Sequence, residues 1–394
     1  MSLNETVSAE RIHIGFFGMR NAGKSSLVNA VTGQSLSVVS PVKGTTTDPV
    51  KKAMELKPLG PVVIVDTPGL DDGGELGSLR VGKAKEMLKI IDIAVLAVDA
   101  FRGETPEDAA LIAALLERKL PFLIALNKCD LLGERPAAPE NALYVSAKTC
   151  EGIEDLKNRL GAFAKRLKND KKILEGLVAP GDTAVLVIPI DASAPKGRII
   201  LPQQQVLREL LDLGCVAVCV QPENLGQTLQ NMKTPPRVVI TDSQAFGRVS
   251  PLVPQSIPLT SFSILFARYK GEMGQLIAGV AALKALKNGD RVLISEGCTH
   301  HRQCGDIGTV KLPAWIRAYA KCEPAFRFTS GGEFPEDLLE YRLIVHCGGC
   351  MLSETAMKSR MAAAAAQNVP MLNYGMAIAE THGILSRALA PFRG

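Results

Sequence analysis

Two cysteines near the C-terminus have the spacing of metal ligands. They lie in HCGGC, residues 346–350, directly after the apolar run from Tyr341 to Val345. Thiols separated by two residues can bind one metal centre, and the glycines between them let the backbone pass close to it. Cys347 and Cys350 therefore provide two ligands of a predicted metal site.

A third thiol follows a second apolar run. Cys298 stands in SEGCTHH, directly after the run from Arg291 to Ser295. Both runs are typical of buried strands, and the carboxyl ends of strands in an open α/β sheet converge on one crevice. We therefore predict that Cys298 joins the other two thiols in one site. Two histidines beside these thiols are candidates for the fourth ligand or for residues that position the ligands, namely His300 and His346.

The identity of the metal stays open at this point. Three thiols and one histidine also compose a closed tetrahedral zinc site, which would give this part of the chain a structural role only. Cys304, which follows Cys298 in the same loop, is a further candidate ligand. A cysteine near a site is, however, more often a small buried apolar residue than a ligand.

The N-terminal part of the chain carries a phosphate-binding loop. The apolar run 12–17 leads into GMRNAGKSS, which fits the pattern G-x-x-x-x-G-K-S and precedes helical periodicity. The N–H groups of such a loop bind phosphates, Lys24 reaches the β and γ oxygens, and the Ser25 hydroxyl binds Mg²⁺. The predicted nucleotide contacts of this loop are Gly18, Asn21, Ala22, Gly23, Lys24, Ser25 and Ser26.

Three further motifs follow in the order of a GTPase, each after an apolar run. DTPG places Asp66 at the Mg²⁺ shell and the N–H of Gly69 at the γ-phosphate. In NKCD, the Asp130 carboxylate can accept both N–H donors of the guanine edge, which adenine lacks. SAK provides a backbone contact to the guanine oxygen. The residues of the two guanine motifs are Asn127, Lys128, Asp130, Ser146, Ala147 and Lys148.

Length and composition place these motifs in a multidomain α/β protein. The chain of 394 residues is too long for one ordinary core, and it is 46% apolar but only 5% aromatic. The net charge of +5 comes without a long basic block, which gives no support to nucleic-acid binding. No apolar run reaches the ~18 residues of a membrane span, and the polar N-terminus lacks a signal-peptide core. We expect a cytoplasmic protein, in which an odd count of nine cysteines favours metal or redox chemistry over a disulfide framework.

Three α/β domains are predicted: a P-loop GTPase domain at 1–170, a small parallel-sheet domain at 175–260 and a metal-binding domain at 262–394. The middle domain carries no visible chemistry. Its β-rich runs alternate with helices, and we interpret Cys215 and Cys219 as core residues. A small sheet has exposed edges, so association with a second copy of the chain is expected.

The first domain resembles the TrmE–Era–EngA class of GTPases. GTTTDP, residues 44–49, resembles the first switch of that class and indicates Thr46 as the switch threonine. Asn21 matches the asparagine that helps to hold K⁺ in potassium-dependent members. Leu70 stands where a Ras-like enzyme has its water-orienting glutamine, so hydrolysis must be arranged otherwise, with K⁺ or a nearby carboxylate. The carboxylates, equally typical of a solvated loop, are Asp71, Asp72 and Glu75, and the residues predicted to support hydrolysis are Lys24, Thr46, Asp66 and Gly69.

The whole chain resembles the FeFe-hydrogenase maturation GTPases. The order Cys298-x-His300 and then His346-Cys347-x-x-Cys350, behind a GTPase domain, carries the resemblance, as do FPEDLLEYRLIVHCGGCM and VPMLNYGMAIAETHGIL. It implies a homodimer with GTPase, dimerisation and iron–sulfur domains, in which three cysteines bind a 4Fe-4S cluster. It also implies a carrier of the di-iron precursor of the hydrogenase active site, which works with two radical-SAM maturases and delivers to the apo-hydrogenase.

Two other functions fit part of the pattern. A GTPase with a structural zinc site could act in tRNA modification or ribosome assembly, although the lack of a basic patch disfavours that function. A cluster that itself acts as a Lewis acid is the second alternative. A radical-SAM reaction is not supported, because the sequence has no Cys-x-x-x-Cys-x-x-Cys set.

Overall fold

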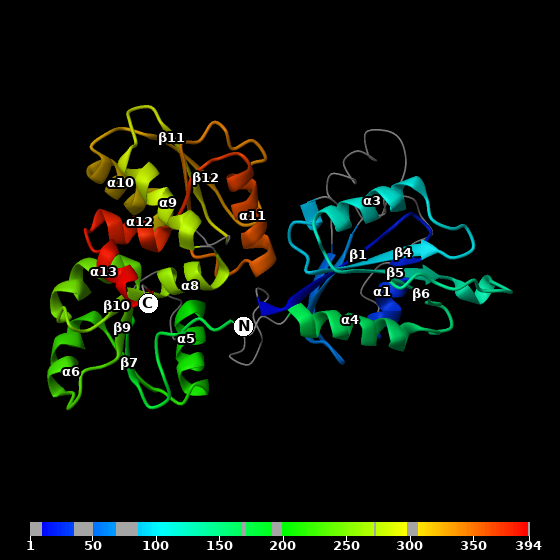
Figure 1. The fold of residues 1–394 in the computed structure, drawn as a ribbon, viewed down its shortest axis with the longest axis horizontal. Coiled ribbons are helices and arrows are strands. Elements are labelled where there is room, and N and C mark those ends of the chain that lie inside the picture. The colour runs from blue at the N-terminus through cyan, green and yellow to red at the C-terminus, as the bar shows by residue number, and fades with distance from the viewer. Residues whose placement is uncertain are drawn as a thin grey trace. The chain divides into compact units, whose positions relative to one another are not determined.

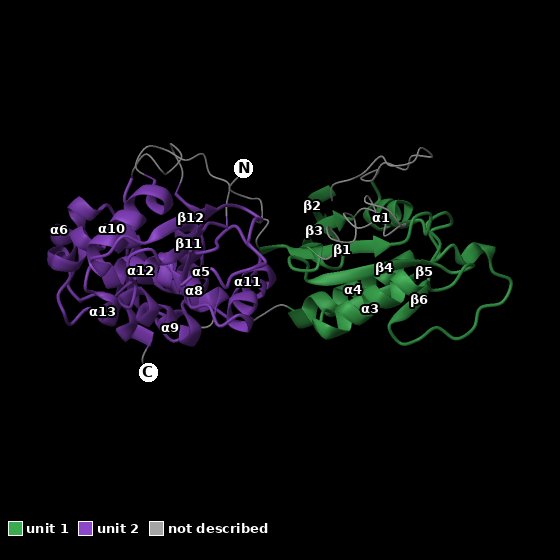
Figure 2. Ribbon diagram, turned by 90° about the horizontal axis from the view of Figure 1, so that it is seen from above, with its two compact units in different colours: residues 1–169 green, residues 170–394 purple. Residues whose placement is uncertain are grey.

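The computed structural model of the chain describes residues 10–34, 50–67, 86–167, 171–190, 199–271, 273–297 and 306–392. The chain divides into two units, residues 1–169 and 170–394 (Figure 2). The described part of unit 1 contains one sheet, and that of unit 2 contains two. Among the described residues, no helix has the length and apolar character needed to cross a membrane.

Unit 1 is a six-stranded sheet with helices on both faces. Its elements are β1 (Ile12–Gly18), α1 (Lys24–Thr32), β2 (Val50–Leu56), β3 (Gly60–Asp66), β4 (Ile93–Asp99), α3 (Pro106–Glu117), β5 (Phe122–Asn127), β6 (Ala142–Tyr144) and α4 (Ile153–Leu167). The strand order is β2-β3-β1-β4-β5-β6, and only β2 runs antiparallel to its neighbour. Apolar side chains of α1 and α4 pack on one face and those of α3 on the other, which explains the nearly continuous apolar strands.

The first part of unit 2 is a four-stranded parallel sheet in the order β10-β9-β7-β8. Its main elements are β7 (Thr183–Val187), α5 (Leu201–Asp212), β8 (Val216–Val220), α6 (Leu225–Asn231), β9 (Val238–Thr241), α7 (Phe246–Val249) and β10 (Leu259–Ser261). We refer to it as the first sheet of unit 2. β8 is an edge strand, and its side chains Val216 and Cys219 are exposed.

The prediction that both cysteines of this region are core residues is wrong for Cys219. Cys215 is buried, and its Sγ lies 3.2 Å from the carbonyl oxygen of Ala179. Cys215 precedes β8, so the alternation of side chains between the two faces of that strand does not relate the two cysteines. Cys219 lies on the edge strand itself, where the side chain is exposed.

The second sheet of unit 2 is also parallel, in the order β12-β11-β13-β14. Its strands and helices are α9 (Met273–Lys284), β11 (Arg291–Ser295), α10 (Leu312–Ala320), β12 (Ala325–Thr329), β13 (Leu343–His346), α11 (Glu354–Ala366), β14 (Met371–Asn373), α12 (Tyr374–Thr381) and α13 (Leu385–Leu389). Ser295 at the end of β11 pairs with His346 at the end of β13. This register confirms that the two predicted strands leave the sheet side by side.

The two sheets of unit 2 are joined by α8 (Phe262–Lys270), a helix that the sequence patterns did not predict. Figure 1 shows α8 between the two sheets. Phe262 and Phe266 belong to an apolar cluster on one face of the first sheet, and Ile264 and Ala267 belong to a larger cluster that includes residues of both sheets. A helix that is apolar on both sides lacks the one-sided periodicity of a surface helix, which explains why the pattern was missed.

A close approach of α9 to β14 provides a test of this packing. An alanine Cβ at Gly279 would lie 2.3 Å from the carbonyl oxygen of Met371. We expect Gly279→Ala to lower the free energy of unfolding of unit 2 by about 1–3 kcal/mol, because backbone atoms must shift to admit the methyl group. Denaturant unfolding would measure the change.

The matched control is Gly274→Ala in the same helix, where nothing lies within 4 Å of the added Cβ. This substitution is expected to be neutral or to stabilise the protein by up to about 1 kcal/mol, because alanine favours the helix. Equal destabilisation by both substitutions would contradict the close packing of α9 on β14.

Candidate functional site

The phosphate-binding loop connects β1 to α1, and a glycine is required where it meets α1. Gly23 has φ +83°, a conformation that residues with a side chain rarely adopt. A Cβ at this position would lie 2.3 Å from Nδ2 of Asn127. The glycine thus allows the phosphate loop and a predicted guanine motif to be in contact.

The residues predicted to bind phosphate and Mg²⁺ lie together at the carboxyl ends of β1 and β3. These strands are parallel neighbours, with Phe16 paired to Asp66. The Nζ of Lys24 donates to Oδ1 of Asp66, and both side chains are only 8% exposed. The hydroxyl of Ser25 lies 3.4 Å from the other carboxylate oxygen of Asp66. Two motifs separated by about forty residues in the sequence thus form one buried polar cluster.

The guanine motifs join the phosphate loop through Asn127. Its Nδ2 donates to the carbonyl oxygen of Ala22 at 2.9 Å, and its Oδ1 accepts from the N–H of Ala147 at 3.0 Å. The Ser146 hydroxyl donates to Oδ1 of Asp130 at 2.7 Å. The structure therefore brings NKCD, SAK and the phosphate loop into one hydrogen-bonded arrangement, although no pattern specified these contacts.

Lys128 links the same loop to β4 through a residue that the sequence patterns missed. Its Nζ lies 2.6 Å from both the carbonyl oxygen of Asn21 and Oδ2 of Asp99. Burial, the largest effect, raises the pKa of Asp99, but hydrogen bonds from Lys128 and the Phe101 N–H leave this pKa below its ordinary value. The carboxylate therefore stays charged and holds Lys128 over the loop. The position of Asp99 at the end of the apolar strand β4 is the sequence signal that could have identified this residue.

The cysteine site lies at the adjacent ends of β11 and β13. The Sγ of Cys347 accepts hydrogen bonds from the N–H of Gly297 at 3.0 Å and from that of Gly349 at 3.4 Å. Gly297 immediately precedes Cys298 in the chain. The backbone that leads into the third predicted thiol therefore touches the sulfur of Cys347.

Lys270 supports the loop that carries the two C-terminal cysteines. Its Nζ donates to the carbonyl oxygens of Gly349 at 3.0 Å, of Cys350 at 3.4 Å and of Leu352 at 2.8 Å. Burial and the charge of Cys347 raise the pKa of the Cys350 thiol. The charge of Lys270 and hydrogen bonds from two backbone N–H groups, those of Cys350 and Met351, act in the opposite direction.

His346 is buried behind the cysteine loop, and both of its ring nitrogens have partners. Nδ1 lies 2.8 Å from the carbonyl oxygen of Cys347, and Nε2 lies 2.9 Å from a guanidinium nitrogen of Arg360. Since a guanidinium only donates, Nε2 accepts and Nδ1 carries the proton. This tautomer leaves neither nitrogen directed at a metal shared by the cysteines.

Arg360 places a second cation close to this loop. It is 7% exposed, and it also donates to the carbonyl oxygen of Gly331 and the hydroxyl of Ser295. Burial, the largest effect, lowers the pKa of Arg360, whereas negative charge at Cys347 raises it. The surroundings of the cysteine loop are therefore suited to a buried anionic group.

Several predicted site residues lie outside the described residues. They are the switch residues Thr46 and Gly69, the carboxylates Asp71, Asp72 and Glu75, and the ligand candidates Cys298, His300 and Cys304. Within the described residues, no three His, Cys, Asp or Glu side chains form a group that could hold a metal ion.

Comparison with protein families assigns each part of the chain. The family described as "Hydrogen maturase F dimerization domain" matches residues 173–271, and "Hydrogen maturase F tetramerization domain" matches residues 274–391. Together they span more than half of the chain. The family described as "50S ribosome-binding GTPase" matches residues 13–128. The chain belongs to the hydrogen maturase F family.

The hydrogen maturase F dimerization match includes α8, so it extends beyond the predicted boundary near residue 260. Cys347 and Cys350 fall in the tetramerization match, and the phosphate loop falls in the GTPase match. Unit 1 is thus a P-loop GTPase domain, and unit 2 carries the two oligomerisation domains. The predicted α/β fold class is confirmed.

The individual relatives described next each match less than half of this chain. The tRNA modification GTPase MnmE of Xanthomonas euvesicatoria pv. vesicatoria is 38% identical over 39% of this chain and 34% of its own. That of Thiobacillus denitrificans is 33% identical over 38% of this chain and 33% of its own. The chain thus spans about a third of the length of these relatives. A solved probable GTP-binding protein engB is 26% identical over 39% of this chain and 99% of its own, with a TM-score of 0.33.

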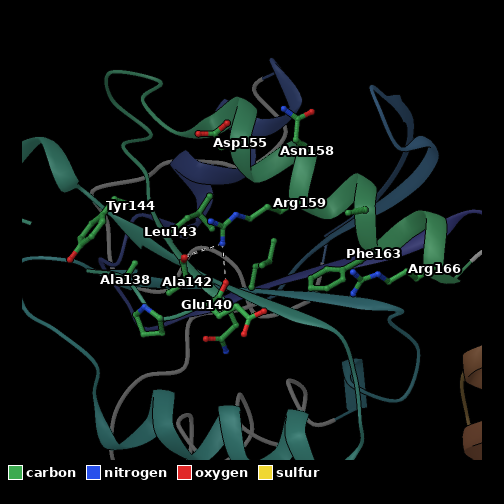
Figure 3. A pocket seen from close by; sticks show the side chains of 14 residues that line it. Ala138, Glu140, Ala142, Leu143, Tyr144, Asp155, Asn158, Arg159, Phe163 and Arg166 are labelled. Carbon is green, nitrogen blue, oxygen red and sulfur yellow. Dashed lines mark hydrogen bonds between the residues drawn. The ribbon is translucent and has the colours of Figure 1, made fainter. Parts of the chain in front are cut away.

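An open cavity of about 1030 Å³ lies elsewhere in unit 1, between α4 and the edge strand β6. Figure 3 shows Arg159 reaching across it to the backbone. The guanidinium donates to the carbonyl oxygens of Glu140 at 3.0 Å and of Ala142 at 3.1 Å. Because Arg159 occupies acceptors near the edge strand, it reduces the capacity of that edge to pair with another strand.

The contact between Asp130 and Ser146 generates a test of base recognition. We expect Asp130→Asn to weaken GTP binding by about 10- to 150-fold, because an amide cannot accept both guanine N–H donors and each hydrogen bond to a charged group contributes about 1.5–3 kcal/mol. Xanthosine triphosphate, which has a carbonyl at the position of the guanine amino group, should gain affinity relative to GTP. Competition binding would measure both effects.

The control for this test is Asp155→Asn on α4, which makes the same chemical change away from the guanine motifs. It is expected to leave both affinities unchanged. Unaltered GTP affinity in Asp130→Asn would refute the assigned role of this carboxylate.

Proposed function

We propose that the chain is a GTP-hydrolysing maturation factor. In this proposal its iron–sulfur domain carries the di-iron precursor of the hydrogenase active site and delivers it to the apo FeFe-hydrogenase. The family assignment supports a role in hydrogenase maturation. The observation that carries the site is the contact between Cys347 and Gly297, which brings two cysteine-bearing loops together.

The residues present fit a 4Fe-4S cluster. The backbone N–H groups of Gly297 and Gly349 donate to the Cys347 sulfur, as such groups do around thiolates that bind iron, and two buried cations, Lys270 and Arg360, lie beside the loop. In our proposal Cys298, Cys347 and Cys350 hold the cluster. A four-iron cluster bound by three cysteines would have one iron without a cysteine ligand. An exchangeable ligand on that iron would suit a carrier.

The two histidines have different roles in this proposal. His346 positions the loop, because both of its ring nitrogens are engaged by Cys347 and Arg360. His300 stays the histidine candidate for the fourth position. The zinc alternative uses the same three cysteines, so metal analysis must separate the two.

GTP is proposed to regulate the exchange of partners. Mg²⁺ would be held by Ser25 and Asp66, K⁺ near Asn21, and the γ-phosphate by Lys24, Thr46 and Gly69. Coupling between a nucleotide site and a distant site is typically about 1–3 kcal/mol, which changes a partner's affinity about five- to 150-fold. That range suits the timing of association with the radical-SAM maturases or the hydrogenase, and it is too small to drive the assembly of a metal cluster.

The proposed homodimer forms through the first sheet of unit 2. The dimerization match covers this sheet, and its edge strand β8 exposes Val216 and Cys219. An exposed, apolar edge strand is suited to pair with the same strand of a second copy.

The separation of the two sites is tested by one substitution in each. Lys24→Ala is expected to abolish GTP turnover and impair hydrogenase activation while iron and sulfide content stay unchanged. Cys347→Ser should lose the cluster and retain GTP turnover. The measurements are phosphate release, iron, sulfide and zinc content, and the electron paramagnetic resonance of anaerobically reconstituted protein.

Cys322→Ser is the control, because it makes the same change in the same part of unit 2 without altering a predicted ligand. Loss of the cluster in Lys24→Ala would contradict separate sites. A full cluster in Cys347→Ser would contradict the ligand assignment. Stoichiometric zinc without iron in the unmodified protein would support the structural-zinc alternative.

The dimer prediction is tested at β8. Val216 is 53% exposed on this strand, and Val216→Lys places a charge in the proposed interface. We expect the dimer to weaken by at least about tenfold in sedimentation equilibrium, because a buried unpaired charge costs more than 1.4 kcal/mol. Leu116→Lys, on α3 of unit 1, is the control and should leave the dimer intact. An unchanged dimer in Val216→Lys would exclude β8 as the interface.

A further inference from the structure

The ammonium group of Lys270 lies inside the turn of backbone that carries the two C-terminal cysteines. Lys270 is the last residue of α8 and is 5% exposed. Its three carbonyl acceptors belong to Gly349, Cys350 and Leu352. A single cation thus fixes the path of the chain on both sides of Cys350.

Two of these carbonyls belong to the peptide groups on either side of the Cys350 α-carbon. The carbonyl of Gly349 shares its peptide with the N–H of Cys350, and the carbonyl of Cys350 shares its peptide with the N–H of Met351. In a trans peptide the C=O and the N–H point in opposite directions, so these two N–H groups point away from the Lys270 ammonium. Burial, the largest effect, raises the pKa of the Cys350 thiol, whereas the Lys270 charge and the two N–H groups lower it.

We propose that Lys270 is a positioning residue for the cysteine loop. By binding the carbonyls of Gly349, Cys350 and Leu352 it fixes the backbone on both sides of Cys350 and polarises the two peptide groups that flank this residue. This inference rests on the proposed function, because the Cys350 sulfur is assigned to an iron–sulfur cluster.

The effect on a bound cluster follows from charge. Hydrogen bonds to the sulfurs and nearby positive charge stabilise the reduced cluster, which is the more negative state, and so raise its reduction potential. Hydrogen bonds with a charged donor are roughly twice as strong as neutral ones, and burial strengthens them further. Lys270 is thus expected to hold the cluster at a higher potential than the cysteines alone would give.

The position of Lys270 is set by both sheets of unit 2. It ends α8, whose Phe266 packs in a cluster of first-sheet residues and whose Ala267 packs in a cluster that includes residues of both sheets. The Nζ lies 5.8 Å from the centre of the Phe266 ring. The helix that reaches the cysteine loop is therefore anchored in the sheet that we expect to dimerise.

Two readouts test the proposal in the full-length protein, one without metal and one with it. In metal-free protein, Lys270→Met should speed hydrogen exchange of the Gly349 and Leu352 amides, which donate to the Cys347 sulfur and to the Gly349 carbonyl. We expect an increase of about tenfold or more, because each charge-assisted hydrogen bond that holds the loop contributes about 1.5–3 kcal/mol. In reconstituted protein, the same substitution should shift the reduction potential of the cluster to a more negative value. Lys270→Arg keeps the charge and the donors and should restore both quantities toward those of the unmodified protein.

The control variant is Arg387→Met. Arg387 is also a cation that donates to three backbone carbonyls of unit 2, those of Ser250, Val253 and Pro254. Its removal should leave the exchange of the Gly349 and Leu352 amides and the cluster potential unchanged. If Lys270→Met does not fold, Lys270→Gln removes the charge, retains one donor group and is expected to change both readouts in the same direction.

The outcomes separate this proposal from the proposed function. Exchange and potential that stay unchanged in folded Lys270→Met or Lys270→Gln would overturn the role of Lys270. If the unmodified protein binds no iron, the proposed function fails, and the exchange readout still decides whether Lys270 positions the loop. An equal change in Arg387→Met would show a general loss of stability and would also overturn the specific role.

Discussion

The parallel pairing of neighbouring strands is the constraint on which both candidate sites depend. β1 and β3 pair with Phe16 opposite Asp66, so that the loops after Gly18 and Asp66 leave the same end of the sheet. β11 and β13 pair in the same way, with Ser295 opposite His346. Parallel strands place all their carboxyl ends at the same end of the sheet, so residues of motifs that are distant in the sequence meet there. The pairing of the strands brings them together, and no short sequence pattern specifies their contact.

Backbone groups and buried cations then complete each site. Around the phosphate loop, the side chains of Lys24, Asn127 and Lys128 join strands to loops. Around the cysteine loop, Lys270 and Arg360 do the same. Both sites are suited to an anion, because N–H groups and cations converge where charge would otherwise be costly to bury. A common physical arrangement therefore suits a nucleotide at one site and, in our proposal, the thiolates of a metal cluster at the other.

The sequence predicts the parts of the fold that have a strong local signal. Apolar runs that end in polar motifs located β1, β3, β5, β11 and β13, and the motifs themselves indicated Lys24, Asp66, Asn127 and the C-terminal cysteines. It did not predict α8, whose apolar residues face two cores, or the exposure of Cys219 on an edge strand. The partners Asp99, Lys270 and Arg360 were missed for a related reason. Each acts through a contact distant in sequence, and no short pattern encodes such a contact.

The link between α8 and the cysteine loop bears on how a carrier can be regulated. A coupling of about 1–3 kcal/mol cannot make or break iron–sulfur bonds, but it is comparable to the few hydrogen bonds by which Lys270 holds the loop. A small displacement of α8 would alter donor–acceptor distances of 2.8 to 3.4 Å, which already reach the upper end of the usual hydrogen-bond range. In our proposal, a modest energy from a partner or from dimerisation can therefore act on the proposed cluster site through the loop around Cys350.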